Sequence, residues 1–551
     1  MNASAQHRPL AAPRMTTAQA TVASLRLHGI DTVYCVPGVQ NDHLMDAFHA
    51  AQHDIRVIHT RHEQGAAYMA LGAAMASGKP AVFCVVPGPG ILNTTAALCT
   101  AYACNAPVLA LTGQIPSANI GRHLGILHEI PDQLGILRSL TKWAERIRTP
   151  SEGASRVAEA FAQMSHGRPR PVALECPLDV WPQTGLVELE GAPVSRPGAQ
   201  LDPKLIARSV EILARATRPV IVVGSGAQHA SDQVRKIAER VHAPVIAHRM
   251  GRGVLDSRHP LSVTAPVGNR LWQDADVVLA IGTRLQMQQM IWGVDASLEV
   301  IRVDADPEEL NRIRPPQVGL VGDAAEVLDL LLEQLPRSSA VNRTRTERIE
   351  SLQAQFAAQL RRLTPQVEFL EAIRAALPEN GIFVDELTQV GYVSRFAFPV
   401  YQPRTFLSPG YQGTLGWGLP AALGAKVARP ESPVVVVSGD GGFLFNIQEL
   451  ATAVQHQIPV VAVVFNDGAY GNVRRTQVEE LGNRTIATDL RNPDFVRLAE
   501  SFGASGLRVN TPEQLSGALR DAIRAAVPTV IEVPVGVMPD PWPLIRLGRV
   551  R

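Results

Sequence analysis

Short, continuously apolar runs alternate with longer amphipathic segments in three successive parts of the chain. This alternation is typical of parallel sheets covered by helices, because each strand is then buried on both faces. The runs predict strands at Thr32–Val36, Arg56–His59, Ala81–Val86, Val108–Thr112, Val172–Glu175, Pro219–Gly224, Val245–Ala247, Val277–Ile281, Val300–Asp304, Gly381–Asp385, Val434–Ser438, Val460–Phe465 and Val530–Val533. The pattern therefore predicts an α/β protein with three doubly wound parallel-sheet domains.

Segments without a helical or strand-like repeat of hydrophobic residues mark the boundaries of these domains. Leu189–Asp202 is rich in Pro and Gly and predicts a linker, while Pro336–Thr364 predicts a polar turn and a charged, solvated connecting helix. We expect a loose tail over residues 1–15 and domains over residues 16–188, 203–335 and 365–551.

Composition narrows the function classes. With 46% hydrophobic and 19% charged residues, the chain can build large cores, which argues against disorder. A formal charge of +1 creates no field for nucleic acid or an anionic membrane, and no apolar stretch reaches the length of a transmembrane helix. The five cysteines lack CxxC or metal-ligand spacing, so we expect reduced thiols and a cytoplasmic protein.

The most informative turn follows the β-branched run Val434–Ser438 and reads Gly439-Asp440-Gly441-Gly442. Ligands of open α/β sheets bind at the carboxyl ends of strands, glycines let a phosphate approach the backbone, and Asp440 supplies a hard oxygen ligand. A helix expected at Ile447–His456 would add a favourable dipole. A simple tight turn has the same composition, so this segment alone leaves both readings open.

A second strand, Val460–Phe465, ends in Asn466-Asp467-Gly468-Ala469-Tyr470-Gly471. If the two strands are parallel neighbours, Asp440 and Asp467 lie together around one cation, and a backbone carbonyl near Ala469 adds a ligand. Ligation by oxygen alone suits Mg²⁺ or Ca²⁺ rather than zinc.

Gly439-Asp440-Gly441, followed after 24 residues by Asn466-Asp467, resembles the thiamine-diphosphate motif of 2-oxo acid decarboxylases and acetolactate synthases. The likeness extends over about Thr16 to Pro541, in the order pyrimidine-binding, central and diphosphate-binding domain. It implies thiamine diphosphate held through Mg²⁺ or Ca²⁺, although the family usually has asparagine where Asp467 stands. The implied metal ligands are Asp440, Asp467 and Ala469, and the implied cofactor-binding residues of these turns are Gly439, Gly441, Gly442, Tyr470 and Gly471.

Other segments resemble the same family. Arg61-His62-Glu63-Gln64-Gly65-Ala66 matches its glutamate segment, which implies that Glu63 bonds the cofactor ring and relays a proton. Gly413 to Pro420 matches the stretch in which Leu415 would bend the cofactor and the Gly413 carbonyl would face its amine. Thr388 and Gln389 match a diphosphate-contacting loop. Glu63 could instead complement a helix dipole, and Leu415 could be ordinary core.

The substrate side resembles the acetolactate-synthase-like branch through Gly113-Gln114-Ile115-Pro116 and His128-Glu129-Ile130-Pro131. Gln114 and His128 could each donate a hydrogen bond to the reacting group or be satisfied structural residues. Thr476 and Gln288 stand where true acetolactate synthases have a tryptophan and an arginine that select the second 2-oxo acid. The resemblance thus implies an enzyme that cleaves or forms C–C bonds next to the carbonyl of a 2-oxo acid or aldehyde, without naming the physiological substrate.

Three further expectations concern the central domain, assembly and rival functions. Gly224-Ser225-Gly226 could begin a site for FAD or ADP, but it lacks the remaining dinucleotide fingerprint, so we favour a structural domain. The resemblance implies a homodimer or homotetramer, because in this family Glu63 and the Gly439–Gly471 region serve one site from two subunits. The rivals are a thiamine-diphosphate- and flavin-dependent 2-oxo acid oxidase and a catalytically silent, nucleotide-binding regulatory protein.

Overall fold

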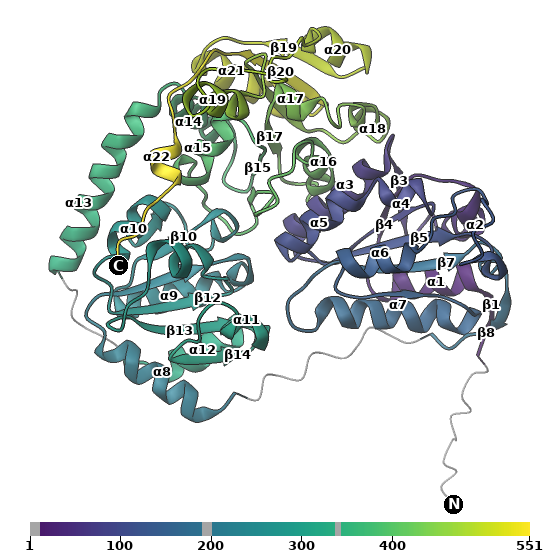
Figure 1. The fold of residues 1–551 in the computed structure, drawn as a ribbon, viewed down its shortest axis with the longest axis horizontal. Helices are drawn as coiled ribbons and strands as arrows, with labels where there is room; N and C mark the ends of the chain where they lie inside the picture. The colour runs from purple at the N-terminus through teal and green to yellow at the C-terminus, as the bar shows by residue number, and fades with distance from the viewer. Residues whose placement is uncertain (1–11, 190–200, 337–342) are drawn as a thin grey trace, which may run out of the picture. The chain divides into compact units, whose positions relative to one another are not determined.

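The computed structural model describes residues 12–189, 201–336 and 343–551, which form two compact units (Figure 1). Within the described residues, the first unit comprises 12–70, 80–102 and 106–189, and the second comprises the remainder. Most of the predicted linker, residues 190–200, lies outside the described residues, as do residues 1–11 of the predicted tail.

The first unit contains a six-stranded parallel sheet in the order β3-β2-β4-β5-β7-β6. Its strands are β2 (Thr32–Cys35), β3 (Arg56–His59), β4 (Ala81–Val85), β5 (Val108–Gln114), β6 (Ala144–Arg146) and β7 (Val172–Pro177). Its helices are α1 (Thr17–Leu27), α2 (Asp42–Ala50), α3 (Glu63–Ser77), α4 (Pro89–Leu92), α5 (Thr95–Cys104), α6 (Gln133–Leu140) and α7 (Pro150–Ser165). Every residue of β4, β5 and β7 is buried, as their unbroken apolar runs predict.

A small antiparallel pair joins the start of the chain to the end of this unit. β1 (Arg14–Thr16) pairs with β8 (Thr184–Leu186), and Met15 packs against a buried cluster that includes Val187. Residues 14 and 15 therefore belong to a strand and not to the end of a loose tail, because the apolar side chain of Met15 packs against this cluster.

The second unit begins with a parallel sheet in the order β11-β10-β9-β12-β13-β14. Its strands are β9 (Pro219–Val223), β10 (Val245–Ala247), β11 (Ser262–Thr264), β12 (Val277–Ile281), β13 (Glu299–Asp304) and β14 (Val318–Val321). Its helices are α8 (Pro203–Arg215), α9 (Ser231–Val241), α10 (Ala265–Trp272), α11 (Pro307–Asn311), α12 (Ala324–Gln334) and α13 (Arg343–Leu360). The predicted connecting helix, α13, is more than a solvated connector, since Ile349 and Leu352 bury in the core of this sheet.

The same unit contains a third parallel sheet in the order β16-β15-β17-β18-β20-β19. Its strands are β15 (Ile382–Asp385), β16 (Phe406–Leu407), β17 (Val434–Gly439), β18 (Val461–Asn466), β19 (Ser505–Arg508) and β20 (Thr529–Pro534). Its helices are α14 (Gln366–Ala376), α15 (Gln389–Ala397), α16 (Gly418–Ala428), α17 (Asp440–Phe443), α18 (Glu449–Gln455), α19 (Gly471–Glu479), α20 (Phe495–Ser501), α21 (Pro512–Ala525) and α22 (Trp542–Ile545). The prediction of an α/β fold with three parallel sheets is confirmed.

The five cysteines are free, and four of them are buried. Burial raises the pKa of the Cys35 and Cys104 thiols to about 12, so both stay protonated near neutral pH. In the described parts of the chain, no helix has the length and apolar character that a membrane crossing requires.

A glycine contact packs two turns of the central sheet together. Gly282 has a φ of +54°, and a Cβ on it would lie 2.5 Å from the Cα and carbonyl carbon of Gly226. The Gly226 N–H also donates to the Gly282 carbonyl at 3.1 Å. Only glycine allows this approach.

We predict that Gly282→Ala destabilises the protein by about 1–3 kcal/mol, because the added methyl group overlaps backbone that cannot move aside. Denaturant unfolding followed by circular dichroism would measure the change. Gly517→Ala is the matched control, since nothing lies within 4 Å of its Cβ position in α21 and alanine favours a helix. Equal stability of the Gly282→Ala protein and the parent would contradict the prediction.

Candidate active site

The Gly439-Asp440-Gly441 turn stands at the carboxyl end of the fully buried strand β17. Asp440 begins the short helix α17, and only 1% of its surface is exposed. The helix expected at Ile447–His456 starts at Glu449 instead, so the helix nearest to the turn is α17. The turn therefore carries a buried carboxylate where a parallel sheet places ligands.

Strand pairing brings the second half of the predicted motif to this turn. β17 and β18 run parallel with Gly439 opposite Phe465, so Asp440 lies beside the segment that contains Asp467. Burial, followed by repulsion from Asp440, raises the pKa of the Asp467 carboxyl to about 6. Two neighbouring carboxyls create an unfavourable concentration of negative charge that a divalent cation would relieve.

Asn492 bridges the two halves, although the sequence analysis did not identify it. Its Nδ2 donates to Asp440 Oδ2 at 2.5 Å and to Asn466 Oδ1 at 2.9 Å. Asn466 in turn donates to buried Glu532 at 2.8 Å. Asn492 lies in an irregular segment without a strand or glycine pattern. The local sequence therefore does not predict its contact with Asp440.

The loop that contains Ala469 and Tyr470 is held on one side by the segment 488–490. Tyr470 N–H donates to the Thr488 carbonyl at 2.8 Å, and Leu490 N–H donates to the Gly468 carbonyl at 2.8 Å. Ala469 N–H donates to Asp467 Oδ1 at 3.2 Å, so the Ala469 backbone lies directly beside this carboxylate.

Three glycines of this region have no room for a side chain. A Cβ on Gly441 would lie 2.6 Å from the Tyr470 ring, one on Gly442 would lie 2.5 Å from Glu386, and one on Gly471 would lie 2.5 Å from Asp467. Gly439 is different, because the nearest atoms to its Cβ position are 3.5 Å away. Gly442 and Gly471 thus let two acidic side chains, Glu386 and Asp467, pack directly against the glycine backbone, an approach that a residue with a Cβ would block.

Glu386 is a second residue that the sequence analysis missed. It follows β15, is fully buried, and accepts the Gly416 N–H at 2.5 Å and the Ser438 hydroxyl at 2.8 Å. Burial raises its pKa to about 7, whereas hydrogen bonds from Gly416, Ser438 and Gly418 lower it. Glu386 therefore ties the turn after Leu415 to the end of β17.

The remaining predicted cofactor residues surround the same strand ends. Thr388 precedes α15, and its hydroxyl lies 3.6 Å from the Cβ position of Gly439. Gln389 Nε2 donates to Asp467 Oδ2 at 2.8 Å. Leu415 is half-buried, 3.5 Å from the Cβ position of Gly442, and Gly413 has a φ of +58°. The structure thus brings the predicted residues of the second unit together, with Gln389 directed at the acidic pair.

In the first unit, Glu63 begins α3, and 17% of its side chain is exposed. Asn93 Nδ2 donates to Glu63 Oε2 at 2.9 Å. Asn93 ends the short helix α4, whose first turn begins at Gly88 with a φ of +59°. The carboxyl is therefore largely shielded and held by the Asn93 amide, and His62 Nδ1 lies 4.0 Å from the same oxygen.

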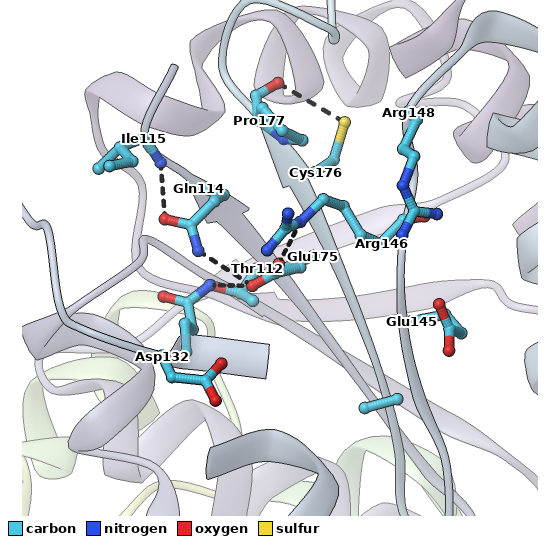
Figure 2. Close-up of polar contacts among 12 residues, drawn as sticks. Thr112, Gln114, Ile115, Asp132, Glu145, Arg146, Arg148, Glu175, Cys176 and Pro177 are labelled. Atoms are coloured by element: carbon cyan, nitrogen blue, oxygen red, sulfur yellow. Dashed lines mark hydrogen bonds and ion pairs between the residues drawn. The ribbon is translucent and has the colours of Figure 1, made fainter. Parts of the chain in front are cut away.

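Gln114 and His128 differ in how well their polar atoms are satisfied. The Gln114 amide donates to Glu175 at 3.1 Å and accepts the Ile115 N–H at 2.8 Å, which directs it into the unit (Figure 2). His128 is half-buried with a φ of +69°, and its buried Nδ1 has no hydrogen-bond partner in the part of the chain that the structure describes. His128 therefore retains an unused ring nitrogen, whereas Gln114 is engaged at both ends of its amide.

The Gly224-Ser225-Gly226 segment packs closely against the backbone of Gly282 and Thr283 in the central domain. A Cβ on Gly224 would lie 2.3 Å from the Gly282 carbonyl oxygen. Nearby, the buried guanidinium of Arg302 donates to the carbonyls of Thr283 and Glu309 at 3.0 and 2.7 Å. Close contact with the backbone around Gly282 thus accounts for glycine at positions 224 and 226.

Within residues 12–189, 201–336 and 343–551, no group of three or more His, Cys, Asp or Glu side chains lies close enough together to hold a metal ion. The Asp440–Asp467 pair offers two carboxylates, and its hard oxygen donors fit a cation that takes its other ligands from backbone and phosphate oxygens.

Family models match the chain in three successive segments. Three models of thiamine pyrophosphate enzymes match the chain: the N-terminal TPP binding domain over residues 15–136, the central domain over 206–331 and the C-terminal TPP binding domain over 388–533. These matches to all three domains show that the chain is a thiamine-diphosphate-dependent enzyme.

Curated relatives match over nearly the full length. The chain is 35% identical to a probable 2-ketoarginine decarboxylase, AruI, of Pseudomonas aeruginosa, with 94% of each chain covered. It is 34% identical to a probable acetolactate synthase large subunit of Methanocaldococcus jannaschii, with 94% and 92% covered, and 32% identical to an acetolactate synthase of Arthrospira platensis, with 98% of each covered. The chain belongs to the thiamine pyrophosphate enzymes, in the branch that contains decarboxylases and acetolactate synthases, which confirms the family expected from the sequence.

We predict that the charge of Glu386 makes the stability of the cofactor-free protein depend on pH. The folded protein keeps a proton on Glu386 up to about pH 7, whereas the unfolded chain releases it near the ordinary pKa of 4.5. The stability of the parent relative to Glu386→Gln should therefore fall as the pH rises from about 5 to 8. Denaturant unfolding of both proteins across that range would measure the difference.

Glu379→Gln is the control for this experiment, because its side chain is 56% exposed and pairs with Arg258 at the surface. Its stability difference from the parent should stay nearly constant over the same pH range. Parallel pH curves for the parent and Glu386→Gln would show that Glu386 does not change its charge there.

Proposed function

We propose that the protein is a thiamine-diphosphate- and Mg²⁺-dependent decarboxylase of a 2-oxo acid. The reaction consumes one proton and converts R–CO–COO⁻ into R–CHO and CO₂. The observation that carries this choice is the state of Gln288 and Thr476, the two positions that depart from acetolactate synthases. Gln288 is 3% exposed in the central domain, and the Thr476 hydroxyl donates to the Asn472 carbonyl at 3.3 Å. Neither side chain supports selection of a second 2-oxo acid.

Acetolactate synthesis is the second candidate, because relatives named acetolactate synthase share 34% and 32% identity over nearly the whole chain. In that reaction the first 2-oxo acid still loses CO₂, but its remaining acyl carbon joins the carbonyl carbon of a second 2-oxo acid. The two candidates share the cofactor site and differ in the acceptor, which is a proton or a carbonyl.

The residues of the second unit would hold the cofactor. We assign Asp440, Asp467 and the Ala469 carbonyl to Mg²⁺. The diphosphate would lie against the backbone of the glycine turns and the loop after β15, and Leu415 and Gly413 would contact the rings. The assigned cofactor-binding residues are Gly439, Gly441, Gly442, Tyr470, Gly471, Thr388, Gln389, Gly413 and Leu415.

Thiamine diphosphate, when bound, supplies an electron sink beside the substrate carbonyl. Glu63 would hold and release the proton that activates the cofactor ring, since its carboxyl is largely shielded and is held by the Asn93 amide at 2.9 Å. His128 would face the substrate, because its buried Nδ1 has no hydrogen-bond partner among the described residues. Gln114 would contribute by shaping the same wall, with its amide held by Glu175.

We assign a structural role to the central domain, rather than FAD or ADP binding, because contacts with Gly282 account for Gly224 and Gly226. A flavin-dependent oxidase is correspondingly disfavoured. We infer a homodimer or homotetramer, since the family resemblance requires two subunits for one site. The five free cysteines support a cytoplasmic location.

A panel of 2-oxo acids with small, branched, aromatic and guanidino side chains tests this function. The purified protein, supplied with thiamine diphosphate and Mg²⁺, is assayed for CO₂ release and for aldehyde and coupled products. Release of CO₂ and aldehyde from one member, absent with Glu63→Gln, is the expected result. Coupled product from pyruvate alone would favour acetolactate synthesis, and no CO₂ from any member would overturn the proposal.

We predict that Glu63→Gln slows hydrogen–deuterium exchange at C2 of bound thiamine diphosphate by about 100-fold or more, because a proton relay contributes about 10²–10⁴. Acid quenching followed by proton NMR measures this exchange without knowledge of the substrate. Cofactor affinity should change less than about threefold, since Glu63 acts on a proton rather than on the diphosphate. Glu159→Gln, which alters a surface ion pair with Arg156, is the control. An unchanged exchange rate in Glu63→Gln would remove Glu63 from the relay.

We predict that Asp440→Ala weakens Mg²⁺-dependent cofactor binding by about 100-fold or more, since even outer partners of metal sites contribute about 10–100-fold. Asp467→Asn should stay within about tenfold, because an amide oxygen can replace the carboxylate ligand. Titration of Mg²⁺ monitored by protein fluorescence would measure both. Asp489→Ala is the control, since Asp489 borders the same loop with 72% of its side chain exposed. Parent-like Mg²⁺ binding by Asp440→Ala would contradict the assigned metal site.

A further inference from the structure

We propose that Glu175 is a positioning residue for the active-site side chains of the first unit. It is the fourth residue of β7, three residues after Val172, and is fully buried. The inference rests on the proposed function in one respect, since it assumes that Glu63 relays a proton. The network that carries it lies entirely within the first unit.

Three donors converge on the Glu175 carboxylate (Figure 2). Arg146 Nε donates to Oε1 at 2.6 Å. Gln133 Nε2 and Gln114 Nε2 both donate to Oε2, at 2.8 and 3.1 Å. A carboxylate has acceptor sites for all three donors, whereas an amide at this position would turn an N–H toward one of them. The buried charge is costly unless it is paired, and Arg146 supplies the pairing.

One branch of the network reaches Gln114. Its amide donates to Glu175 and accepts the Ile115 N–H at 2.8 Å, so rotation of the amide would break both contacts. Glu175 thus fixes which amide atom faces the interior. The conformation of the Gln114–Ile115 segment depends on that choice.

A second branch reaches the turn before α4. Gln133 donates to Glu175 and to the Gly113 carbonyl, which leaves its Oε1 to accept the Gly88 N–H at 3.0 Å. Gly88 has a φ of +59°, and its Cβ position lies only 2.4 Å from the His128 carbonyl oxygen. The Gln133 amide therefore sets the backbone against which the His128 main chain packs.

The same turn continues to Glu63. Gly88 directly precedes α4, and Asn93, which directly follows it, donates to Glu63 Oε2 at 2.9 Å. A short helix is stiff over this distance because backbone bonds from Leu92 to Gly88 and from Asn93 to Pro89 close it. Displacement of Gly88 would thus move the Asn93 amide relative to the Glu63 carboxyl.

The structure therefore assigns one anchor to all three predicted catalytic residues of this unit. Gln114 donates directly to Glu175. The other two are connected to Glu175 through Gln133 and Gly88: the His128 main chain packs against Gly88, and α4, which follows Gly88, places the Asn93 amide on Glu63. Active-site groups act efficiently only when such outer contacts lock their geometry, and a misplacement of about 1 Å can cost about 10²-fold in rate. Glu175 acts through these contacts and touches no reacting atom.

The test uses the full-length protein with Glu175→Gln, Gln133→Met and a control, Glu145→Gln. Gln133→Met keeps the side-chain length and the Arg146–Glu175 pair but removes the acceptor of the Gly88 N–H. Glu145 lies one residue before Arg146, and its side chain is 25% exposed and pairs with surface Arg138. The control thus removes a carboxylate of the same sheet edge outside the network.

Two measurements report on position rather than on turnover. Amide hydrogen exchange followed by mass spectrometry, in the cofactor-free protein, should show about tenfold faster exchange over residues 88–94 in Glu175→Gln and Gln133→Met. Exchange at C2 of bound thiamine diphosphate should slow about tenfold in the same two proteins, with cofactor affinity within about threefold of the parent. Glu145→Gln should match the parent in both.

Parent-like exchange at both the amides and C2 in Gln133→Met would overturn the inference, and so would equal changes in Glu145→Gln. If Glu175→Gln does not fold, Gln133→Met alone decides the question. Glu63→Gln is measured in parallel. An unchanged C2 exchange rate there would refute the proposed relay, whereas slow exchange in Glu63→Gln together with parent-like Gln133→Met refutes only the positioning role.

Discussion

Parallel pairing of β17 with β18 is the constraint on which the cofactor end of the second unit depends. The register sets Gly439 opposite Phe465, so the first residue after each strand reaches the same sheet edge. Asp440 and Asp467 then become neighbours, at a cost visible in the raised pKa of Asp467. A slip of one residue would turn the side chains of one strand to the other face and would separate the two carboxyls.

Residues outside the two motif halves hold this unfavourable arrangement in place. Asn492 donates to Asp440 and Asn466, Gln389 donates to Asp467, and Glu532 accepts from Asn466. These neutral amide donors reduce the repulsion between the carboxyls without supplying a competing positive charge. A metal ion thus remains the species best suited to balance the site.

The sequence predicted what local pattern controls. Runs such as Val434–Ser438 predict the central strands correctly. A strand buried on both faces consists of consecutive apolar, often β-branched, residues, and this pattern is visible in the sequence. Short strands such as β6 and β19 were not predicted. Both are edge strands, which are partly exposed, so apolar and polar residues alternate only weakly along them. The proximity of Asp440 and Asp467 followed from strand spacing. The roles of Asn492, Glu386 and Gln133 did not, because each role depends on contacts with residues 20 or more positions away in the sequence.

Buried carboxyls recur at the carboxyl ends of strands in both units, and their partners determine what each can do. Glu175 is held by the guanidinium of Arg146 together with two amides, so its charge is matched and its two oxygens have different donors. Glu386 is held by backbone N–H groups and a hydroxyl, and these do not outweigh burial, since its pKa rises to about 7. A charged partner makes a carboxylate a fixed anchor, whereas neutral donors leave its proton exchangeable near neutrality. The first unit therefore has a rigid anchor beneath the residues proposed to act on the substrate. In the second unit, the Glu386 contact between the Leu415 turn and β17 changes its charge within the pH range in which the protein is expected to work.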